Sequence, residues 1–392
     1  MEPETKLEDS LTYDLTAWAI PYAYDLEAYA SPQRINVQTK EAIDFEPSTP
    51  DQSAVYAVLA NWKDANDVRF LAQLFKKGIK VRHATKSFIH DGQSFERGTL
   101  VINRADNRHI GEEYLDMVTA IAAELEVKLH FTESGYTYEG IDLGSNYVPF
   151  LQAPKVATIR GDNVGTGGFG EIWHYFEQVI DYPIHVIGSD YASRVDLSQY
   201  DVLVLASGGY NGNGLSDAIR DFARDGGKVI AFERAIRIFS SSESSLASAI
   251  KGQQKEGPPR KPSPEDQLRR YEDSERQGLS YYSAGSIYRV SVDESHPLAY
   301  GQDGETFIMK RSSSTYPYLG SGGWNVGVIK PNSLVSGYVG SQLKTNLNHS
   351  LEFGTESFGR GDVVYFVDSP IFRGFWHSGN LLLGNALFLV GQ

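Results

Sequence analysis

The stretch "GGKVIAFERAIRIF", Gly226 to Phe239, decides the fold that we predict for this chain. Two glycines close a helix, four apolar residues from Val229 to Phe232 predict a buried strand, and "ERA" then turns the chain toward another helix. In several families of α/β enzymes a sharp strand-to-helix turn of this kind presents a nucleophile. Here the position holds Glu233, and the chain contains no cysteine. The stretch therefore predicts a central strand that ends in an acid where a nucleophile would stand.

Length and composition predict a globular protein with more than one core. The chain has 392 residues, of which 41% are hydrophobic, and this length exceeds one typical domain. A formal charge of −14 argues against a nucleic-acid partner or an anionic membrane, since both need a basic surface. No apolar run approaches the ~18 residues of a membrane span. The absence of cysteine excludes disulfides, thiolate nucleophiles and cysteine-based metal sites.

The order of expected elements divides the chain into three parts. Residues 1–52 are an N-terminal tail and helical linker, and their polar start, "MEPETKLEDS", reads as a cut made in a linker. Residues 53–150 read as a small α/β domain with the order strand–helix–strand–hairpin–helix–strand. Residues 151–392 alternate strands and helices around very apolar strands, which predicts a parallel, flavodoxin-like sheet covered on both faces.

Individual elements follow from periodicity and from turn residues. We expect strands at Ser53–Trp62, Lys80–Phe88, Lys128–Ser134, Lys155–Asp162, His185–Asp190, Tyr200–Tyr210 and Lys228–Phe232, and helices at Asp64–Gly78, Glu112–Glu126, Gly170–Ile180 and Leu215–Gly227. Residues 240–285 are rich in Ser, Gly and Pro and read as an insertion with one helix around "PEDQLRRYEDSERQ". The insertion is either a solvated surface excursion or a docking arm or lid over the site.

The candidate site lies at the C-terminal ends of the strands, where α/β sheets bind ligands. Ser207 in "LASGGY" is a possible nucleophile with His296 or His377 as base, although no G-x-S-x-G elbow surrounds it. Glu233 alone is expected to pair with a nearby arginine (Arg160, Arg234 or Arg237), or to act as an acid or base if it is buried. The expected pocket comprises Arg160, Asp162, Ser207, Gly208, Gly209, Glu233, Arg234 and His296.

Phosphate and metal chemistry find little support in the sequence. The loop "RGDNVGTGGFG" lacks the Lys–Ser/Thr pair of a phosphate-binding loop. "HIGE", His109 to Glu112, has the His-x-x-Glu spacing of a zinc carboxypeptidase, but Glu112 and Glu113 read better as acids in the first turn of a helix. The other histidines show no comparable cluster. We therefore expect no metal site and no cofactor in this chain.

Several stretches in order resemble the C-terminal half of large bacterial zinc carboxypeptidase-like proteins. They include "YDLTAWAIPYAY", "EGIDLGSNYVPFL", "GEIWHYFEQVIDYPIHVI", "SIYRVSVDESHPLAYG" and "RGDVVYFVDSPIFRGFWHSGNLLLGNALF". The later two-thirds, through "LASGGY", "GGKVIAFERA" and "SHPLAYG", resemble a class I glutamine amidotransferase-like domain. The resemblance covers nearly all of residues 10–392.

The resemblance implies that this chain has the fold of the family but lacks the family's catalytic residues. The family's zinc ligands and catalytic Glu would lie upstream of Met1, so zinc is implied only for an absent catalytic domain, and the amidotransferase nucleophile's place falls on Glu233. A periplasmic or secreted setting is implied, with the protein's own N-terminal peptidase domain as partner and a peptide or cell-wall substrate. The expected function is a non-catalytic accessory region that positions the peptidase domain or binds a substrate or partner.

Two other functions stay open from the sequence. One is a hydrolase built from Glu233, Ser207 and a histidine. The other is an assembly module anchored by aromatic side chains, which packing within the chain would explain equally well. These aromatic residues are Tyr281, Tyr282, Tyr316, Tyr318 and Trp324.

Overall fold

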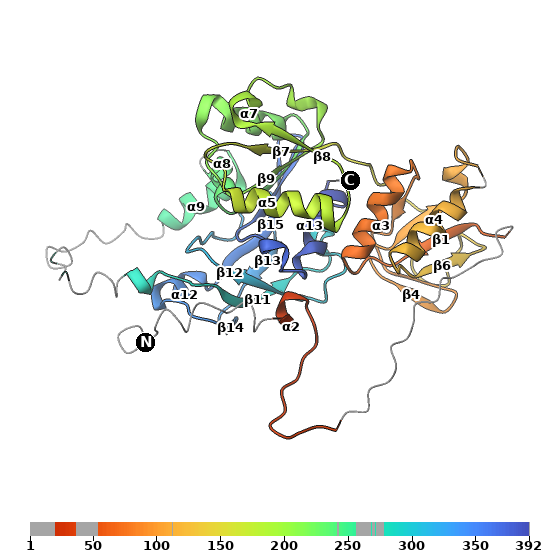
Figure 1. Ribbon diagram of the computed structural model, residues 1–392, viewed down its shortest axis with the longest axis horizontal. Helices are drawn as coiled ribbons and strands as arrows, with labels where there is room; N and C mark the ends of the chain where they lie inside the picture. Colours follow the sequence, from red (N-terminus) through yellow and green to blue (C-terminus); the bar gives the residue numbers. More distant parts are fainter. Residues whose placement is uncertain are drawn as a thin grey trace.

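The computed structural model describes residues 20–36, 54–111, 113–240, 243–255, 268, 271 and 278–391. Within them the chain is mixed α/β, with one large mixed sheet and one smaller antiparallel sheet (Figure 1). None of the helices in these ranges has the length and apolar character that a bilayer crossing requires.

The smaller sheet has the strand order β2-β5-β1-β6, and its neighbouring strands are antiparallel. Strand β1 is buried on both faces: Val58 and Ala60 join the main core, whereas Ala57 and Leu59 join a second cluster with Phe88 of the β3–β4 hairpin. The part of the chain that contains this sheet comprises, in order, β1 (Ala57–Ala60), α3 (Ala65–Lys76), β2 (Arg82–His83), β3 (Phe88–His90), β4 (Gln93–Phe95), β5 (Leu100–Asn103), η1 (Ala105–Asn107), α4 (Glu113–Glu124) and β6 (Leu129–Thr132).

Most elements predicted for this region are confirmed. Helix α3 begins with a reciprocal capping box between Asp64 and Asp67, which fixes its first turn. The expected strand Lys80–Phe88 is wrong, because the chain turns after His83 and only re-enters a strand at Phe88, in a separate two-stranded sheet. The β3–β4 hairpin turns through Asp91 and Gly92, both of which have positive φ.

The large sheet is mixed, with ten strands in the described ranges. Strands β8, β7, β9, β10 and β16 run parallel in that spatial order, and β15, β13, β11 and β12 continue the sheet with antiparallel pairs. Strand β14 pairs with β11 off this path. The predicted all-parallel sheet is therefore wrong for the second half. Parallel neighbours need a long crossover, whereas β15 and β16 are joined by a short turn at Gly359 and Arg360 that can only form an antiparallel pair.

The large sheet and the helices that cover it comprise many short elements, which follow one another along the chain. They are β7 (Val156–Arg160), α5 (Thr166–His174), η2 (Tyr175–Val179), β8 (Ile184–Gly188), α6 (Ser189–Ala192), η3 (Leu197–Gln199), β9 (Val202–Leu205), η4 (Gly212–Gly214), α7 (Leu215–Arg224), β10 (Lys228–Phe232), η5 (Glu233–Ile236), α8 (Arg237–Ser240), β11 (Ser286–Val292), η7 (Pro297–Ala299), β12 (Glu305–Lys310), β13 (Gly323–Ile329), β14 (Leu334–Ser336), α12 (Ser341–Leu347), β15 (Ser350–Phe358), β16 (Gly361–Phe366), η8 (Phe372–Gly374) and α13 (Gly379–Phe388).

Strand β10 is central, as the opening stretch of sequence predicts. It lies between β9 and β16 in parallel register, so that Ile230 pairs with Val204 on one side and Val364 on the other. All of its residues are buried. Glu233 follows directly at its carboxyl end, which confirms the predicted position of this acid.

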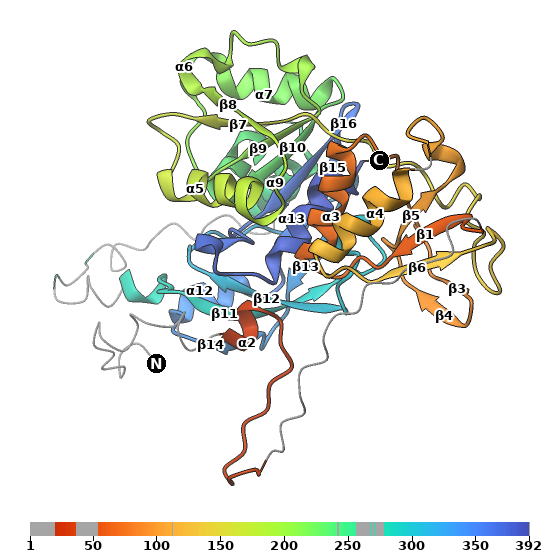
Figure 2. The ribbon, with the colours of Figure 1, turned by 45° about the vertical axis from the view of Figure 1, so that its right-hand side comes forward.

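Helix α13 joins the two sheets. Each of its residues is buried, as expected for a helix that is apolar on all sides. It packs beside α3 (Figure 2), and the Nε1–H of Trp62 donates a hydrogen bond to Oδ1 of Asn385 at 2.5 Å. Lys228, at the start of β10, donates from Nζ to the carbonyls of Leu387 and Val390 at the helix end, and burial lowers the pKa of this lysine to about 7.

Two short helices lie in the predicted N-terminal linker and in the predicted insertion. Helix α2 (Ile20–Ala23) belongs to the predicted helical linker and contains Pro21 in its first turn, where proline is tolerated; residues 1–19 lie outside the described residues. Helix α9 (Ser245–Lys255) occupies the start of the expected insertion, with Leu246 buried, so this part of 240–285 is helical, contrary to the prediction. The helix expected around "PEDQLRRYEDSERQ" lies outside the described residues except for Leu268 and Tyr271.

Candidate functional site

A cleft of about 580 Å³ opens at the carboxyl ends of β9, β10 and β16. This is the edge at which open α/β sheets bind ligands. Helix α5 forms one wall with its glycines, and the segment after β16 forms another. The lining residues are Gly165, Gly167, Gly168, Gly170, Glu171, His174, Ser207, Phe232, Glu233, Arg311, Ser369, Phe372, Arg373 and Gly374.

Glu233 stands in this cleft on a strained turn. Its φ is +49°, a left-handed conformation that costs a residue with a Cβ about 1 kcal/mol or more. Ser207 lines the cleft next to Glu233, and its hydroxyl favours the ionised form of the Glu233 carboxyl. Burial raises the pKa of the Glu233 carboxyl above 4.5, and the negative charges of Asp368 and Glu171 act in the same direction, against Ser207 and Arg311. A strained, half-buried acid in a cleft is the usual mark of a functional position.

Replacing Glu233 with glutamine is expected to stabilise the protein at pH 8 by about 1 kcal/mol, a common size for a single-residue effect. The pKa of Glu233 is higher in the folded state than its unfolded value of 4.5, so ionisation of this acid destabilises the folded protein. The destabilisation is complete at a pH above the folded-state pKa and is absent at a pH below 4.5. The gain should therefore shrink as the pH falls toward 4.5. Urea unfolding of both proteins from pH 4 to pH 8 measures this.

The matched control is Glu177→Gln, since Glu177 is exposed on η2. It should leave the free energy of unfolding unchanged across the same pH range. A Glu233→Gln protein that is no more stable than the wild type at pH 8 would contradict the assigned environment of Glu233.

Two arginines bring positive charge to the same cleft. The guanidinium groups of Arg311 and Arg373 lie 3.9 Å and 5.2 Å from the centroid of the Phe372 ring. The nearby Glu171 is already engaged: its Oε2 accepts from the Ser369 hydroxyl at 2.7 Å and its Oε1 accepts from the Arg373 amide at 3.0 Å. The cleft thus combines a carboxyl of raised pKa with guanidinium groups on the opposite wall.

A buried charge network lies beneath Glu233. Nζ of Lys310 contacts Oδ2 of Asp368 at 2.5 Å, with both side chains almost fully buried. Burial raises the pKa of Glu352 to about 8, although Lys310 opposes this shift, and Oε1 of Glu352 accepts from the Asp368 amide at 3.1 Å. Burial alone would lower the pKa of Lys310, but Asp368 and Glu352 together raise it. Since Glu233 also interacts electrostatically with Lys310 and Glu352, the cleft and the network titrate together.

The glycines after β9 hold the neighbouring loop in place. A Cβ on Gly208 would lie 2.9 Å from the Asn163 carbonyl oxygen, so only glycine lets the 161–165 loop approach this closely. The Gly209 amide donates to the same carbonyl at 2.8 Å, and the Gly165 amide donates to the Ser207 carbonyl at 2.9 Å. Gly208 and Gly209, which were expected in the pocket, do not line the cleft but hold the loop that leads to Gly165, which does.

The structure brings together some of the expected pocket residues and not others. Ser207 and Glu233 line the cleft side by side. Arg160, Asp162 and Arg234 are exposed and do not line it. His296 also lies elsewhere: Nδ1 accepts from the Leu298 amide at 3.1 Å and Nε2 lies 3.2 Å from the Thr355 hydroxyl.

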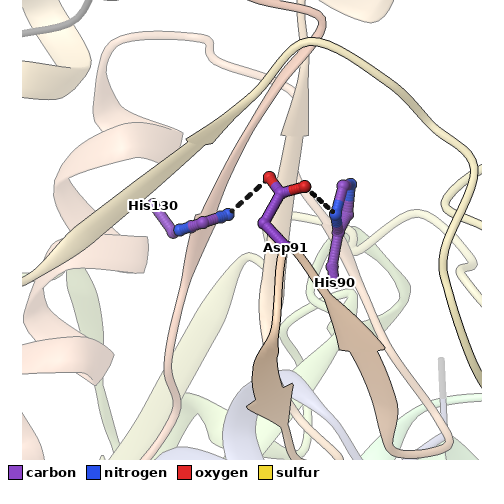
Figure 3. Close-up of side chains that lie close together, drawn as sticks. All are labelled: His90, Asp91 and His130. Atoms are coloured by element: carbon purple, nitrogen blue, oxygen red, sulfur yellow. Dashed lines mark hydrogen bonds and ion pairs between the residues drawn. The ribbon is translucent and has the colours of Figure 1, made fainter.

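The side chains that surround Glu233 were missed by the sequence analysis. Arg311, and not one of the three expected arginines, is the arginine that lowers the pKa of Glu233, and Lys310 also interacts with this acid. His174 is the histidine that lines the cleft, on the last turn of α5. The sequence has no motif that groups its other histidines, but the fold brings His90 and Asp91 of the β3–β4 hairpin close to His130 of β6 (Figure 3). Glu112 of "HIGE" lies outside the described residues.

A second cleft, of about 690 Å³, lies at the opposite edge of the parallel strands. It is lined by Asp201, Asp225 and Asp362 among others. The Asp201 carboxylate accepts from the Lys155 amide at 2.7 Å, which ties the start of β7 to the start of β9. This edge holds the amino ends of the strands and serves the packing of the sheet.

Comparison with known proteins gives structural neighbours only. No family model and no curated protein sequence matches the chain. A solved structure from Bacteroides uniformis described as ThuA-like is 14% identical, covers 62% of this chain and 93% of its own, and has a TM-score of 0.35. Another from Thermoplasma acidophilum, described as part of a GMP synthase, is 11% identical, covers 60% and 94%, and also has a TM-score of 0.35. At these values the likenesses carry no argument about function, and nothing in them shows a carboxypeptidase parent.

Proposed function

We propose that this chain is a non-catalytic accessory region that recognises a ligand in the cleft around Glu233. One observation carries the proposal: the acid at the carboxyl end of central strand β10 sits at a strained turn, inside a cleft of about 580 Å³. In this interpretation the fold is a class I glutamine amidotransferase-like scaffold whose nucleophile position holds a carboxylate. The domain organisation predicted from the sequence, with a small α/β domain before this scaffold, belongs to the same proposal.

The absence of a thiol supports a binding role over amide transfer. The sequence contains no cysteine, and a carboxylate is a poor substitute for a thiolate in attack on an amide. Burial raises the pKa of Glu233, with Asp368 and Glu171 acting in the same direction, and the same surroundings would disfavour any anionic nucleophile at that position. The scaffold is therefore better suited to holding a ligand than to transforming one.

The charges in the cleft favour a ligand that carries both a carboxylate and an amine. Arg311 and Arg373 can accept a carboxylate, for which guanidinium groups are well matched. Glu233 can accept an ammonium group, which would stabilise its ionised form. The ends of an unblocked peptide carry these two charges. This ligand agrees with a peptide or cell-wall substrate of a zinc carboxypeptidase-like parent protein.

The proposal that this chain belongs to a larger parent protein is based on the sequence resemblance. In it the accessory region would position the N-terminal peptidase domain or its substrate, in a periplasmic or secreted setting. The catalytic zinc would belong to that peptidase domain.

Binding of unblocked trialanine to the whole chain, measured by calorimetry, tests the proposal. We expect wild-type protein to bind it and to bind N-acetyl-trialanine amide much more weakly. Glu233→Gln should weaken binding by about tenfold, the equivalent of one charge-assisted contact of about 1.4 kcal/mol, and Glu177→Gln should not. Absence of binding, or equal binding by Glu233→Gln, would refute ligand recognition at this site. Release of alanine from the peptide, with or without added zinc, would refute the non-catalytic role.

A hydrolase is the second candidate, because strained backbone and a carboxyl of raised pKa also occur at catalytic acids and bases. Its residues would be Glu233, Ser207 and His174, which all line the cleft. This candidate predicts turnover of a simple ester such as p-nitrophenyl acetate that is lost in both Glu233→Gln and Ser207→Ala. Equal rates in these variants and in the wild type would dismiss it.

A further inference from the structure

Two histidines and an aspartate converge where the β3–β4 hairpin lies against strand β6 of the smaller sheet: His90 and Asp91 are consecutive, and His130 lies far from them along the chain. His90 ends β3, Asp91 begins the turn of the β3–β4 hairpin, and His130 lies on β6 (Figure 3). Nδ1 of His90 lies 3.2 Å from Oδ1 of Asp91, and Nε2 of His130 lies 3.1 Å from Oδ2 of the same carboxylate. One ligand atom from each residue lies within 4.8 Å of the other two.

We propose that His90, Asp91 and His130 bind one Zn²⁺ ion. None of these residues lines the cleft that holds Glu233, so the inference is independent of the proposed function.

The hydrogen bonds of His90 set its tautomer. Nε2 lies 2.9 Å from the carbonyl oxygen of Ser134, which can only accept, so Nε2 carries a proton. Neutral His90 then directs the lone pair of Nδ1 at the Asp91 carboxylate, and two acceptors 3.2 Å apart repel each other. A cation between them removes the repulsion. Zn²⁺ would accept electron pairs from both.

The bond from Nε2 to the Ser134 carbonyl is also the support that metal-binding histidines usually have. Such histidines donate their second ring N–H to a carbonyl or carboxylate, which fixes the ring and presents the other nitrogen to the metal. His90 is buried, and its Nε2 also lies 2.7 Å from the Thr132 hydroxyl. The ring is therefore held before any ion arrives.

The spacing of the ligand atoms suits zinc. With bonds of about 2.0–2.2 Å, neighbouring corners of a zinc tetrahedron lie roughly 3.3 Å apart. The two nitrogen–oxygen distances here, 3.2 Å to Oδ1 and 3.1 Å to Oδ2 of Asp91, are close to that value, and all three ligand atoms lie within 4.8 Å, so that small side-chain rotations would bring them around one ion. Imidazole nitrogens favour zinc over magnesium or calcium, which prefer oxygen ligands. The Asp91 side chain is 55% exposed, so water can complete the coordination.

An ion at this position would fasten the hairpin to the sheet. Strand β6 is an edge strand of the smaller sheet, and β3 and β4 form a separate two-stranded sheet in which Ile89 also bridges to Glu139. The ion would bind the hairpin through His90 and Asp91 and bind β6 through His130. We therefore expect zinc to raise the thermal midpoint of unfolding, because it binds the folded arrangement alone.

The test is zinc binding by the tag-free whole chain after treatment with a chelator. Calorimetry should show one Zn²⁺ per chain, and Co²⁺ in its place should give the visible absorption of a cobalt ion held by nitrogen and oxygen ligands. His130→Ala and Asp91→Asn should each weaken zinc binding by about a hundredfold or more. Asparagine tolerates the left-handed φ of +48° at position 91, so the second variant keeps the turn.

The matched control is His185→Ala, an exposed histidine on β8, which should bind zinc as the wild type does. A wild-type chain that takes up no stoichiometric zinc overturns the proposal, and a proton on Nδ1 of His90 is then the cation that faces Asp91. Binding that survives both His130→Ala and Asp91→Asn also overturns it, since the ion then sits elsewhere.

Discussion

Replacing Asn385 with leucine is expected to lower the free energy of unfolding by about 3–5 kcal/mol. Asn385 is fully buried on α13, and its side chain makes three hydrogen bonds. Oδ1 accepts from Trp62, and Nδ2 donates to the carbonyls of Leu298 and Tyr300 at 3.0 Å and 2.8 Å. Leucine has nearly the same shape, so the loss comes from the three polar groups left without partners, at about 1–3 kcal/mol each before relaxation.

The position of these partners makes the effect informative about the fold. Trp62 lies in the loop that joins β1 of the smaller sheet to α3, α13 covers the large sheet, and Leu298 and Tyr300 lie in the connection between β11 and β12. One side chain thus fastens three parts of the chain together. Urea unfolding followed by tryptophan fluorescence measures the loss, and Asn346→Ala, at an exposed position on α12, is the matched control. A loss below about 1 kcal/mol would mean that water replaces these bonds and that α13 is not the joint between the sheets.

The central strand could be predicted because its signal is local. Glycines, an apolar run and a turn lie within one short stretch, and burial on both faces of β10 follows from that pattern. The antiparallel half of the large sheet could not be found in the same way. Its strands do not lie in the sheet in their order along the chain: β11 lies between β12 and β13, and β15 lies between β13 and β16, so no local pattern predicts which strands pair.

The residues of the candidate site also differ in how far the local sequence predicts them. Ser207 and Glu233 could be predicted together because each ends a recognisable strand, and parallel strands bring such ends to one edge. Arg311 and His174 could not, because one follows an antiparallel strand and the other ends a helix, and neither stands in a motif. The cluster of His90, Asp91 and His130 joins residues distant in sequence and depends on a hairpin folding back over β6. Spacing along the chain contains no signal for it.

Lys310→Met is expected to cost about 3–5 kcal/mol of unfolding free energy, the usual result of removing one partner of a buried ion pair. The ammonium group faces Asp368 and also donates to the Ser314 carbonyl at 2.7 Å, and the lysine side chain is fully buried. Without it, Asp368 lies beside Glu352 and Glu233 and lacks the ammonium charge that balances these acids. The folded variant should take up protons to relieve this, so the loss should be larger at pH 8 than at pH 5.

The exposed Lys344→Met on α12 is the control for losing a lysine, and it should change little at either pH. The double variant Lys310→Met with Asp368→Asn removes both charges and keeps an oxygen for the Arg311 amide, which in the wild type donates to Oδ1 of Asp368 at 3.1 Å. It should recover much of the loss, because a neutral pair is less costly to bury than a lone carboxylate. If the single variant were as stable as the wild type at pH 8, Lys310 would not be the group that balances the charge of Asp368 beneath the cleft. Glu233 would then need another source of compensating charge, and Arg311 alone would have to supply it.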